Sequence, residues 1–234
     1  MKQKHIFLLL ISIAVFHPSA FFAQEEQQPA DTLEYREKYG LRLGIDLSKP
    51  LRTVLDENYQ GFEIKGDYRI YEDYYLAAEI GNEKNLISEP SVTAEASGSY
   101  IKVGVNYNAY ENWQGMENLI FAGLRYGFAT FSTALQEFSV YSPTNYFGPD
   151  VRTETQEFNN LTASWIELQL GIKVEVLNNV FLGTHVQLKR RVTATTPGNF
   201  DNLYIPGFHR TYDNSTWGVG YGYSISYLLP FYKK

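Results

Sequence analysis

The sequence contains no cysteine and no long basic run, and both absences narrow what the chain can do. Without cysteine there is no disulfide framework, no thioether anchor for a lipid, no catalytic thiol and no thiolate metal site. The 20 Lys and Arg residues are outnumbered by 26 Asp and Glu residues, so nucleic acid is not an expected partner. No loop carries the spaced aspartates of a calcium site. We therefore expect neither a metal nor a cofactor.

The N-terminus has the pattern of a secretory signal rather than of a membrane helix. After a positively charged start, the apolar stretch over residues 6–16 is roughly 16 Å long as a helix, too short for a hydrocarbon layer of about 30 Å. We predict a signal peptide over residues 1–23, cleaved after Ala23, with Ala20 as the alternative. Residues 24–38 are polar and acidic, which predicts a disordered leader. Residues 39–234 are then predicted to form one domain.

Beyond the signal, the chain is rich in aromatic residues and alternates in polarity. Its 19 Tyr and 15 Phe favour strands and membrane interfaces. Apolar and polar residues alternate with period two in eight segments, which predicts strands. The segments cover residues 41–48, 62–70, 74–81, 101–107, 120–128, 166–174, 182–192 and 217–229. We predict an all-β chain that forms an eight-stranded antiparallel up-and-down transmembrane β-barrel.

The connections between the segments alternate in length. Long and short connections follow one another over residues 50–59, 71–73, 85–98, 108–118, 132–160, 177–179 and 195–215. Outer-membrane barrels combine short periplasmic turns with long external loops. We therefore expect the loops at about 132–160 and 195–215 to be external.

Alternation alone does not decide which face of the barrel points inward. A soluble periplasmic lipocalin-like binding barrel would turn its apolar face inward, and it remains an alternative. The uncharged Gly and Ser residues of the last segment, and Trp217 and Tyr227 about 25 Å apart in height, favour the membrane arrangement. The polar faces also carry charges of both signs, as buried ions require. The predicted polar network of the lumen is Arg42, Asp46, Glu63, Lys65, Asp67, Arg69, Glu79, Lys102, Arg125, Glu167, Lys173, His185, Lys189 and Arg191.

The signal, the segment pattern and the loop asymmetry resemble the small outer-membrane barrels of the OmpA and OmpX type. The aromatic last segment, from Tyr221 to Phe231, is similar to the terminal strand that such proteins offer to the barrel-insertion machinery, although Lys233 and Lys234 follow it. More narrowly, the chain resembles a family of small Bacteroidota outer-membrane barrels of unknown function. The resemblance implies a fold, the insertion machinery as a partner during biogenesis and a location in the bacterial cell outer membrane, but no activity.

An enzyme that modifies lipid A, an acyl hydrolase or transferase, is the alternative to a non-enzymatic barrel. Such chemistry needs a base beside a nucleophile, and no His and Ser share a strand at a suitable spacing. His185 is predicted to join the interior network. His209, next to Arg210, is either a plain loop residue or an acid–base group. We predict a non-enzymatic barrel in which an eight-stranded lumen is filled by side chains and conducts nothing.

Arg190 and the external loops are the candidate binding elements. Arg190 interrupts the apolar face near the outer surface, where it either contacts lipopolysaccharide phosphate or extends to the interface. Alternation over residues 136–141 and 151–158 predicts a protruding hairpin. Aromatic residues in the two long loops form the predicted binding surface for an extracellular protein or glycan, unless they pack together over the barrel mouth. These residues are Tyr146, Phe147, Tyr204 and Phe208.

Overall fold

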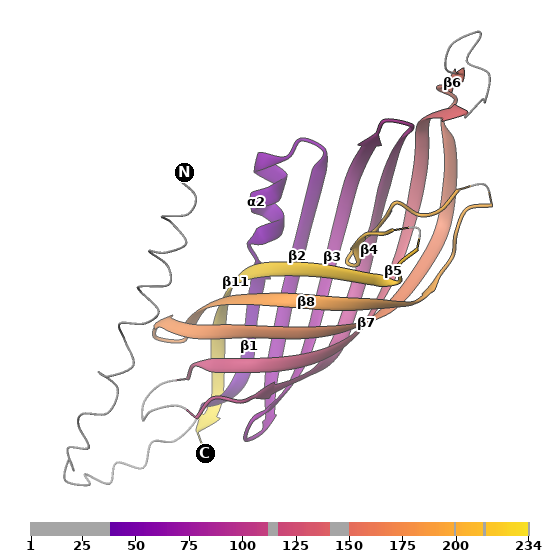
Figure 1. The fold of residues 1–234 in the computed structure, drawn as a ribbon. Coiled ribbons are helices and arrows are strands. Elements are labelled where there is room, and N and C mark those ends of the chain that lie inside the picture. Colours follow the sequence, from indigo (N-terminus) through magenta and orange to yellow (C-terminus); the bar gives the residue numbers. More distant parts are fainter. Residues whose placement is uncertain (1–37, 112–116, 141–149, 199, 213, 234) are drawn as a thin grey trace, which may run out of the picture. The chain divides into compact units, whose positions relative to one another are not determined.

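The computed structural model describes residues 38–111, 117–140, 150–198, 200–212 and 214–233 (Figure 1). The predicted signal peptide, the leader up to residue 37, and Tyr146 and Phe147 of the predicted binding surface lie outside the described residues.

Eight antiparallel strands form a closed ring, so the predicted eight-stranded up-and-down barrel is confirmed. Each strand pairs with its neighbours along the chain, and the first pairs with the last. The ring consists of β1 (Lys38–Asp46), β2 (Tyr59–Tyr71), β3 (Tyr74–Glu89), β4 (Val92–Asn108), β5 (Leu119–Val140), β7 (Gln156–Leu177), β8 (Val180–Ala194) and β11 (Trp217–Lys233). Strand β1 thus begins one residue before the predicted boundary of the domain.

Four short elements of the described residues lie outside the ring. Strand β6 (Asp150–Arg152) pairs with the end of β5. Strands β9 (Tyr204–Ile205) and β10 (His209–Arg210) pair with each other within the segment that connects β8 to β11. Helix α2 (Ser48–Leu55) follows β1, where a plain connection was expected, and Pro50 fits its first turn because proline needs no hydrogen bond there. No helix among the described residues is long and apolar enough to cross a membrane.

The strands turn apolar side chains outward and charged side chains inward. In β3, exposed and buried residues alternate strictly from Tyr74 to Asn85. The exposed positions include Ile80, which is 57% exposed, whereas Glu79 beside it is 4% exposed. This is the reverse of a water-soluble barrel, in which the charged face is solvated.

The outward face changes from apolar to polar at one level of the sheet. Two paired rows across β3, β4 and β5 mark the change, with Ile80, Ile101 and Phe128 in the row below it and Asn82, Ser99 and Thr130 in the row above it. The strands continue beyond this level, so β3, β4, β5 and β7 extend past the apolar band (Figure 1).

This extension corrects one predicted connection and confirms another feature. The prediction of a long connection over residues 85–98 is wrong, because β3 and β4 stay paired up to Glu89 and Val92 around a tight turn. Above the apolar band the outward residues of β3 and β4 are polar apart from Leu86, so the alternation that marks a strand fades although the backbone pairing continues. The predicted hairpin is confirmed, since β5 and β7 remain paired up to Leu135 and Gln156.

The barrel wall is interrupted on one side. The pairing of β1 with β11 ends at Asp46 and Ser224, after which the Leu47 N–H donates to the Tyr223 carbonyl at 2.6 Å and the chain enters α2. From that point the start of β2 pairs only with β3, and the start of β11 pairs only with β8. Helix α2 lies beside β2 at this interruption (Figure 1).

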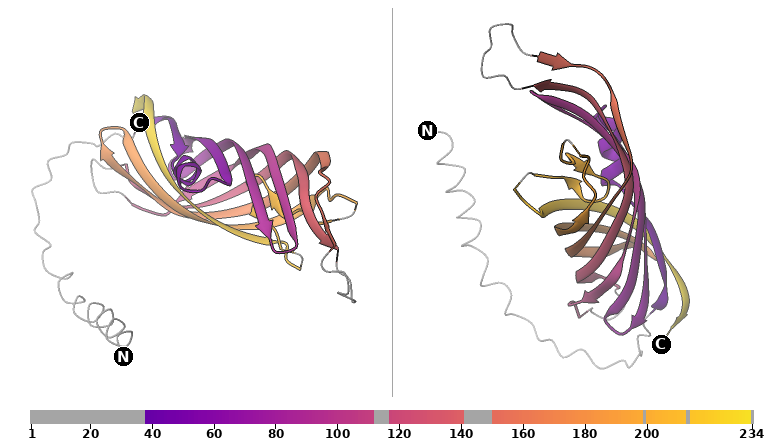
Figure 2. Two further views of the ribbon diagram at one scale, coloured as in Figure 1. Left: turned by 90° about the horizontal axis from the view of Figure 1, so that it is seen from above. Right: turned by 90° about the vertical axis from the view of Figure 1, so that its right-hand side faces the viewer.

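The segment between β8 and β11 covers the inner face of the extended strands (Figure 2). Ile205 and Phe208 pack against Tyr100, Phe131 and Trp165 in the largest apolar cluster of the described chain. The Phe208 and Trp165 rings meet edge to face with centroids 6.0 Å apart. This segment therefore closes the interior at the end where the strands are longest.

Candidate functional site

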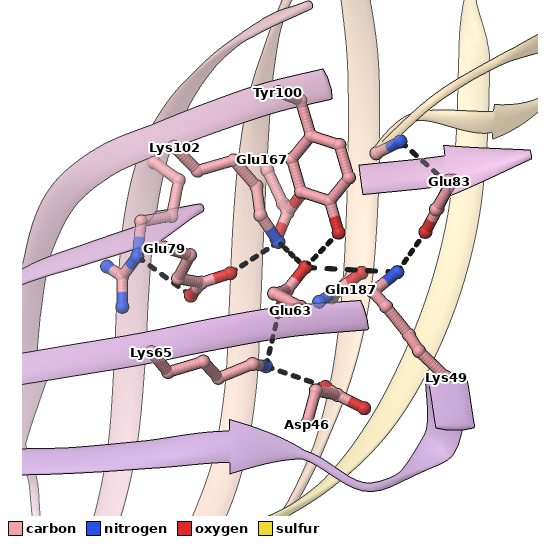
Figure 3. A network of polar contacts seen from close by, with 12 residues as sticks. Asp46, Lys49, Glu63, Lys65, Glu79, Glu83, Tyr100, Lys102, Glu167 and Gln187 are labelled. Atoms are coloured by element: carbon pink, nitrogen blue, oxygen red, sulfur yellow. Dashed lines mark hydrogen bonds and ion pairs between the residues drawn. The ribbon is translucent and has the colours of Figure 1, made fainter. Parts of the chain in front are cut away.

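A cluster of buried ions fills the middle of the barrel (Figure 3). Lys102, which is 1% exposed, pairs with Glu79, and its Nζ lies 3.3 Å from a Glu63 oxygen and 3.7 Å from a Glu167 oxygen. Arg125 Nε lies 3.4 Å from Glu79. Each buried charge therefore has a partner of opposite sign, which is the condition for burying it at all.

The ion cluster continues on both sides of this centre. Lys65 Nζ lies 2.9 Å from Asp46 and 3.1 Å from Glu63, and it also contacts His185 Nε2 at 3.1 Å. His185 in turn lies 2.9 Å from the Gln187 amide nitrogen.

Nearer the short turns, Asp67 joins two cations of the barrel interior. Arg42 lies 3.0 Å from Asp67, and Lys173 pairs with the same carboxylate. Arg69 Nη1 lies 4.0 Å from Glu117. Lys38, at the start of β1, lies 3.4 Å from Glu175 and so belongs to the barrel rather than to the leader.

Glu83 joins helix α2, the barrel wall and the part of the connection between β8 and β11 over residues 204–211, which we call the capping segment. Its carboxylate pairs with Lys49 of α2 and accepts hydrogen bonds from the Tyr59 hydroxyl at 3.1 Å and the Tyr204 hydroxyl at 2.7 Å. The Gly207 N–H also donates to it at 2.9 Å, and His209 Nε2 lies 3.7 Å away. Because these partners come from separate segments, one fully buried carboxylate fixes α2 and the capping segment to β3.

The charges of the groups around Glu83 follow from burial and from their neighbours. Burial disfavours the ammonium of Lys49, but the Glu83 and Glu63 carboxylates outweigh it and raise the Lys49 pKa. Burial, and then Glu83, raise the pKa of Tyr204. Burial, and then the nearby Lys189, lower the pKa of His209 to about 4 despite Glu83. At neutral pH, Lys49 is therefore charged and His209 is neutral.

The structure brings together most of the residues that the sequence assigned to the lumen. Those from Arg42 to Lys189 in the predicted network point inward, and all but Arg69, which lies near Glu117, contact other members of the network as described above, with Lys189 Nζ 3.9 Å from Glu167. Arg191 is partly exposed, and within the described ranges it has no ion pair. Arg191 still pairs with the inward Trp165, in register with the pair of Lys189 and Glu167, and a bulge shifts the pairing just beyond it.

The remaining predicted binding residues have different positions. Arg190 points outward, and its guanidinium lies 5.6 Å from the centre of the Trp217 ring. Tyr204 and Phe208 are 2% and 1% exposed, so the exposed binding surface predicted for them is wrong. The reason is that their segment folds against the inner face of the extended strands, where the two rings replace water.

The part of the chain that the structure describes offers no evident catalytic or metal constellation. No group of His, Asp and Glu residues within it could hold a metal ion. Neither His185 nor His209 has a serine partner there, since His185 contacts Lys65 and Gln187 while His209 lies beside Lys189 and Glu83. What the arrangement does is to cross-link the strands through charge and to fill the lumen.

Sequence reasoning missed Glu83 and Lys49. Glu83 was detectable, because it continues the inward series of Glu79 and Gly81 by one more period of two. Lys49 has no such signal, since it lies in a short helix whose inward face depends on where β1 ends.

The sequence profile of the domain of unknown function DUF6048 matches residues 4–234. The chain belongs to the DUF6048 family. No curated protein matches this DUF6048 chain significantly. Among solved structures, it is similar to the crystal structure of Ail, the attachment invasion locus protein of Yersinia pestis. That similarity has a TM-score of 0.43 at 9% identity and covers 82% of this chain and 98% of Ail.

Proposed function

We propose that this DUF6048 protein is a non-enzymatic barrel of the bacterial outer membrane, exported by its N-terminal signal and inserted by the barrel-insertion machinery. The orientation of the strand faces carries this proposal. Leu168 is 44% exposed on the outer surface, whereas Gln169 beside it is 2% exposed in the lumen. Apolar side chains on the outside of a closed ring suit acyl chains, and the ring pairs the strand backbones in lipid everywhere but at the interruption between β1 and β11.

The soluble alternative conflicts with the outer surface. Large apolar residues that are more than one third exposed lie on every strand of the ring, far beyond the scattered apolar residues of a soluble monomer. The change from Ile80, Ile101 and Phe128 to Asn82, Ser99 and Thr130 gives this surface a defined upper limit, as a hydrocarbon layer would. Tyr74 and Tyr107, whose rings lie 5.4 Å apart near the short turns, suit the opposite interface.

The strands that extend beyond the apolar band supply the surface role. With the loop over residues 195–215 folded inward, the region over residues 132–160 is the candidate for binding an extracellular protein or glycan. The paired backbone of β5 and β7 makes this hairpin a rigid support. The protein thus has a structural or surface-binding role.

Spin labels at positions 168 and 169 test the orientation. We expect a label at 168 to contact lipid and a label at 169 to be shielded from it, and the protein to fractionate with outer membranes and migrate faster on gels when unheated. A label at 169 that contacts lipid, or release of the protein with osmotic-shock fluid, contradicts the proposal. The non-enzymatic part fails if deletion or overexpression changes the acyl number of lipid A in mass spectra.

We also infer that Arg190 binds lipopolysaccharide phosphate at the outer interface. It lies on the outer face beside Trp217, next to the upper limit of the apolar band. Arg190→Glu is expected to reduce the lipopolysaccharide that copurifies with the protein. Unchanged retention removes this contact.

A further inference from the structure

A cavity of about 600 Å³ lies at the interruption of the barrel wall, between α2 and β11. Inward-facing polar residues line one part of it, chiefly Lys49, Glu63, Lys102, Gln187 and Lys189. Outward-facing apolar residues line the other part, chiefly Leu51, Leu55, Val186, Val219 and Tyr221. Because residues of both faces line one cavity, it connects the outer surface of the barrel with its charged interior.

We infer that this cavity binds an anionic amphiphile from the surrounding membrane. The head group lies in the wall against Lys189 and Gly220, and the acyl chain lies along the outer face of β11. The inference rests on the proposed membrane orientation of the barrel.

The apolar part of the cavity is placed to accept an acyl chain. Val219 and Tyr221 are 74% and 68% exposed, although both lie on β11 between Trp217 and Tyr227, within the apolar band. Leu55 of α2 is 76% exposed on the facing side of the cavity. An acyl chain between β11 and α2 would cover these side chains.

The edge of β11 at the cavity calls for a hydrogen-bonding ligand. The Tyr223 carbonyl accepts the Leu47 N–H, and backbone groups on a strand alternate in direction, so those of Tyr221 and Val219 face the same open side. Over residues 217–223 of β11, no described residue of β1 pairs with this strand. Unpaired backbone groups are costly in hydrocarbon, and a polar head group would satisfy them.

The charge at the cavity favours an anionic head group. The lining contains four cations, Lys49, Arg52, Lys102 and Lys189, but only two carboxylates, Asp46 and Glu63. Of these cations, Lys189 is the one whose ammonium can donate a further hydrogen bond. It is completely buried, donates to the Gly207 carbonyl at 2.7 Å and lies 3.5 Å from His209 Nδ1, while its carboxylate partner Glu167 is 3.9 Å away. An ammonium has three hydrogens to donate, so a phosphate oxygen can be added to its partners.

Gly220 keeps the space in front of Lys189 open. A Cβ at this position would lie 2.7 Å from the Gln187 side-chain oxygen, 3.3 Å from His209 Cε1 and 3.3 Å from Lys189 Nζ. The Gln187 and Lys189 atoms are the ends of flexible side chains, and all three residues line the cavity, so a larger residue can be accommodated by small movements into it. Gly220→Val is therefore expected to fill the site while leaving the fold intact.

Gly183→Val is the matched control. Position 183 also lies on the inner face of a strand, and its nearest neighbour would be the Ser224 hydroxyl at 2.7 Å. It does not line the cavity. The pair therefore separates filling of the cavity from the general effect of valine in the barrel.

The test uses the purified protein in dodecyl maltoside with dodecyl phosphate as the probe, measured by isothermal titration and native mass spectrometry. We expect saturable binding of one probe molecule, weakened at least about tenfold by Gly220→Val and by Lys189→Gln but not by Gly183→Val. Inorganic phosphate is expected to bind far more weakly, because it lacks the acyl chain. Absence of saturable binding, equal binding to the Gly220→Val protein, or equally tight binding of inorganic phosphate overturns the inference.

The experiments distinguish failure of the proposed amphiphile site from failure of the proposed membrane orientation. Spin labels at positions 168 and 169 in the same preparation report the orientation without involving the cavity. Lipid contact at 168 together with no probe binding rejects the amphiphile site alone, whereas lipid contact at 169 rejects the proposed function.

Discussion

At the scale of single residues, Glu83 has the greatest expected influence on stability. Glu83→Gln keeps the shape of the side chain but leaves Lys49 with only Glu63, 3.8 Å away, as a partner. Because the buried ammonium of Lys49 then lacks its nearest carboxylate, we expect the free energy of unfolding to fall by about 3 kcal/mol. Guanidinium unfolding in detergent micelles, followed by gel migration, measures it.

Glu95→Gln provides the control for this substitution. Glu95 lies 2.9 Å from Lys84 in an exposed ion pair on the extended strands. Its loss is expected to change the free energy of unfolding by less than about 1 kcal/mol. Equal effects of the two substitutions would contradict the role of Glu83.

His209 makes the capping segment sensitive to acid. Its environment contains Lys189 on β8, Glu83 on β3 and the stacked ring of Tyr204, and its pKa falls from 6.5 to about 4. Between these pH values the detached segment binds a proton that the packed segment does not, so packing weakens as the pH falls from about 6.5 to about 4.

Hydrogen exchange of the amides over residues 204–211 measures this effect. We expect faster exchange at pH 5 than at pH 7 once the intrinsic rates are corrected. Asparagine tolerates the positive φ of 84° at this position, so the His209→Asn protein should fold in the same way but lose most of the difference in exchange rate between pH 5 and pH 7. A pH dependence that survives this substitution would rule out His209 as its source.

The sequence predicted the inward direction of most interior residues but not their partners. Period two assigns Glu79, Lys102 and Glu167 to one face whatever their neighbours are. That these three residues meet depends on the stagger between strands β3, β4 and β7, which no local pattern records. The same limit applies to Tyr204 and Phe208, whose burial depends on where their segment folds.

At the scale of elements, α2 is attached to β2 through Thr53. Its hydroxyl accepts the Gly61 N–H at 3.0 Å and donates to the Lys49 carbonyl at 3.0 Å. Thr53→Val removes both hydrogen bonds at nearly constant volume, so we expect the free energy of unfolding to fall by about 1 kcal/mol and α2 to exchange its amides faster.

The reverse substitution on the adjacent residue tests the specificity of this attachment. Val54 is 82% exposed and has no part in the contact with β2. Val54→Thr should therefore leave amide exchange in α2 nearly unchanged. If both substitutions loosen the helix equally, the Thr53 hydrogen bonds do not hold it.

Strand ends were harder to predict than strand centres. Within the apolar band, each residue faces either acyl chains or the lumen, so polarity alternates and marks the strand. Beyond Ile80 and Ile101 both faces of β3 and β4 admit polar residues, and the expected loop is in fact paired strand. Helix α2 was not predicted, because eight residues are too few for a clear helical period.

At the scale of the whole molecule, the paired ions should prevent conduction. Lys102, Arg125 and their carboxylate partners are almost completely buried across the middle of the ring. An eight-stranded barrel has a lumen just wide enough for its own side chains. We expect no stable conductance steps in planar bilayers. Reproducible steps that persist in independent preparations would show that the interior opens.

The sequence by itself determined the strand count, the antiparallel order and which residues share a face within the apolar band, because the pleat of a strand imposes period two on any chain with one apolar face. Only the tertiary structure decided which charges pair, where the wall is interrupted and that the segment before β11 folds inward. These features depend on the stagger between neighbouring strands and on contacts between residues more than a hundred positions apart, such as Glu83 and Tyr204. No local pattern encodes such distances, and closure of the ring sets them all at once.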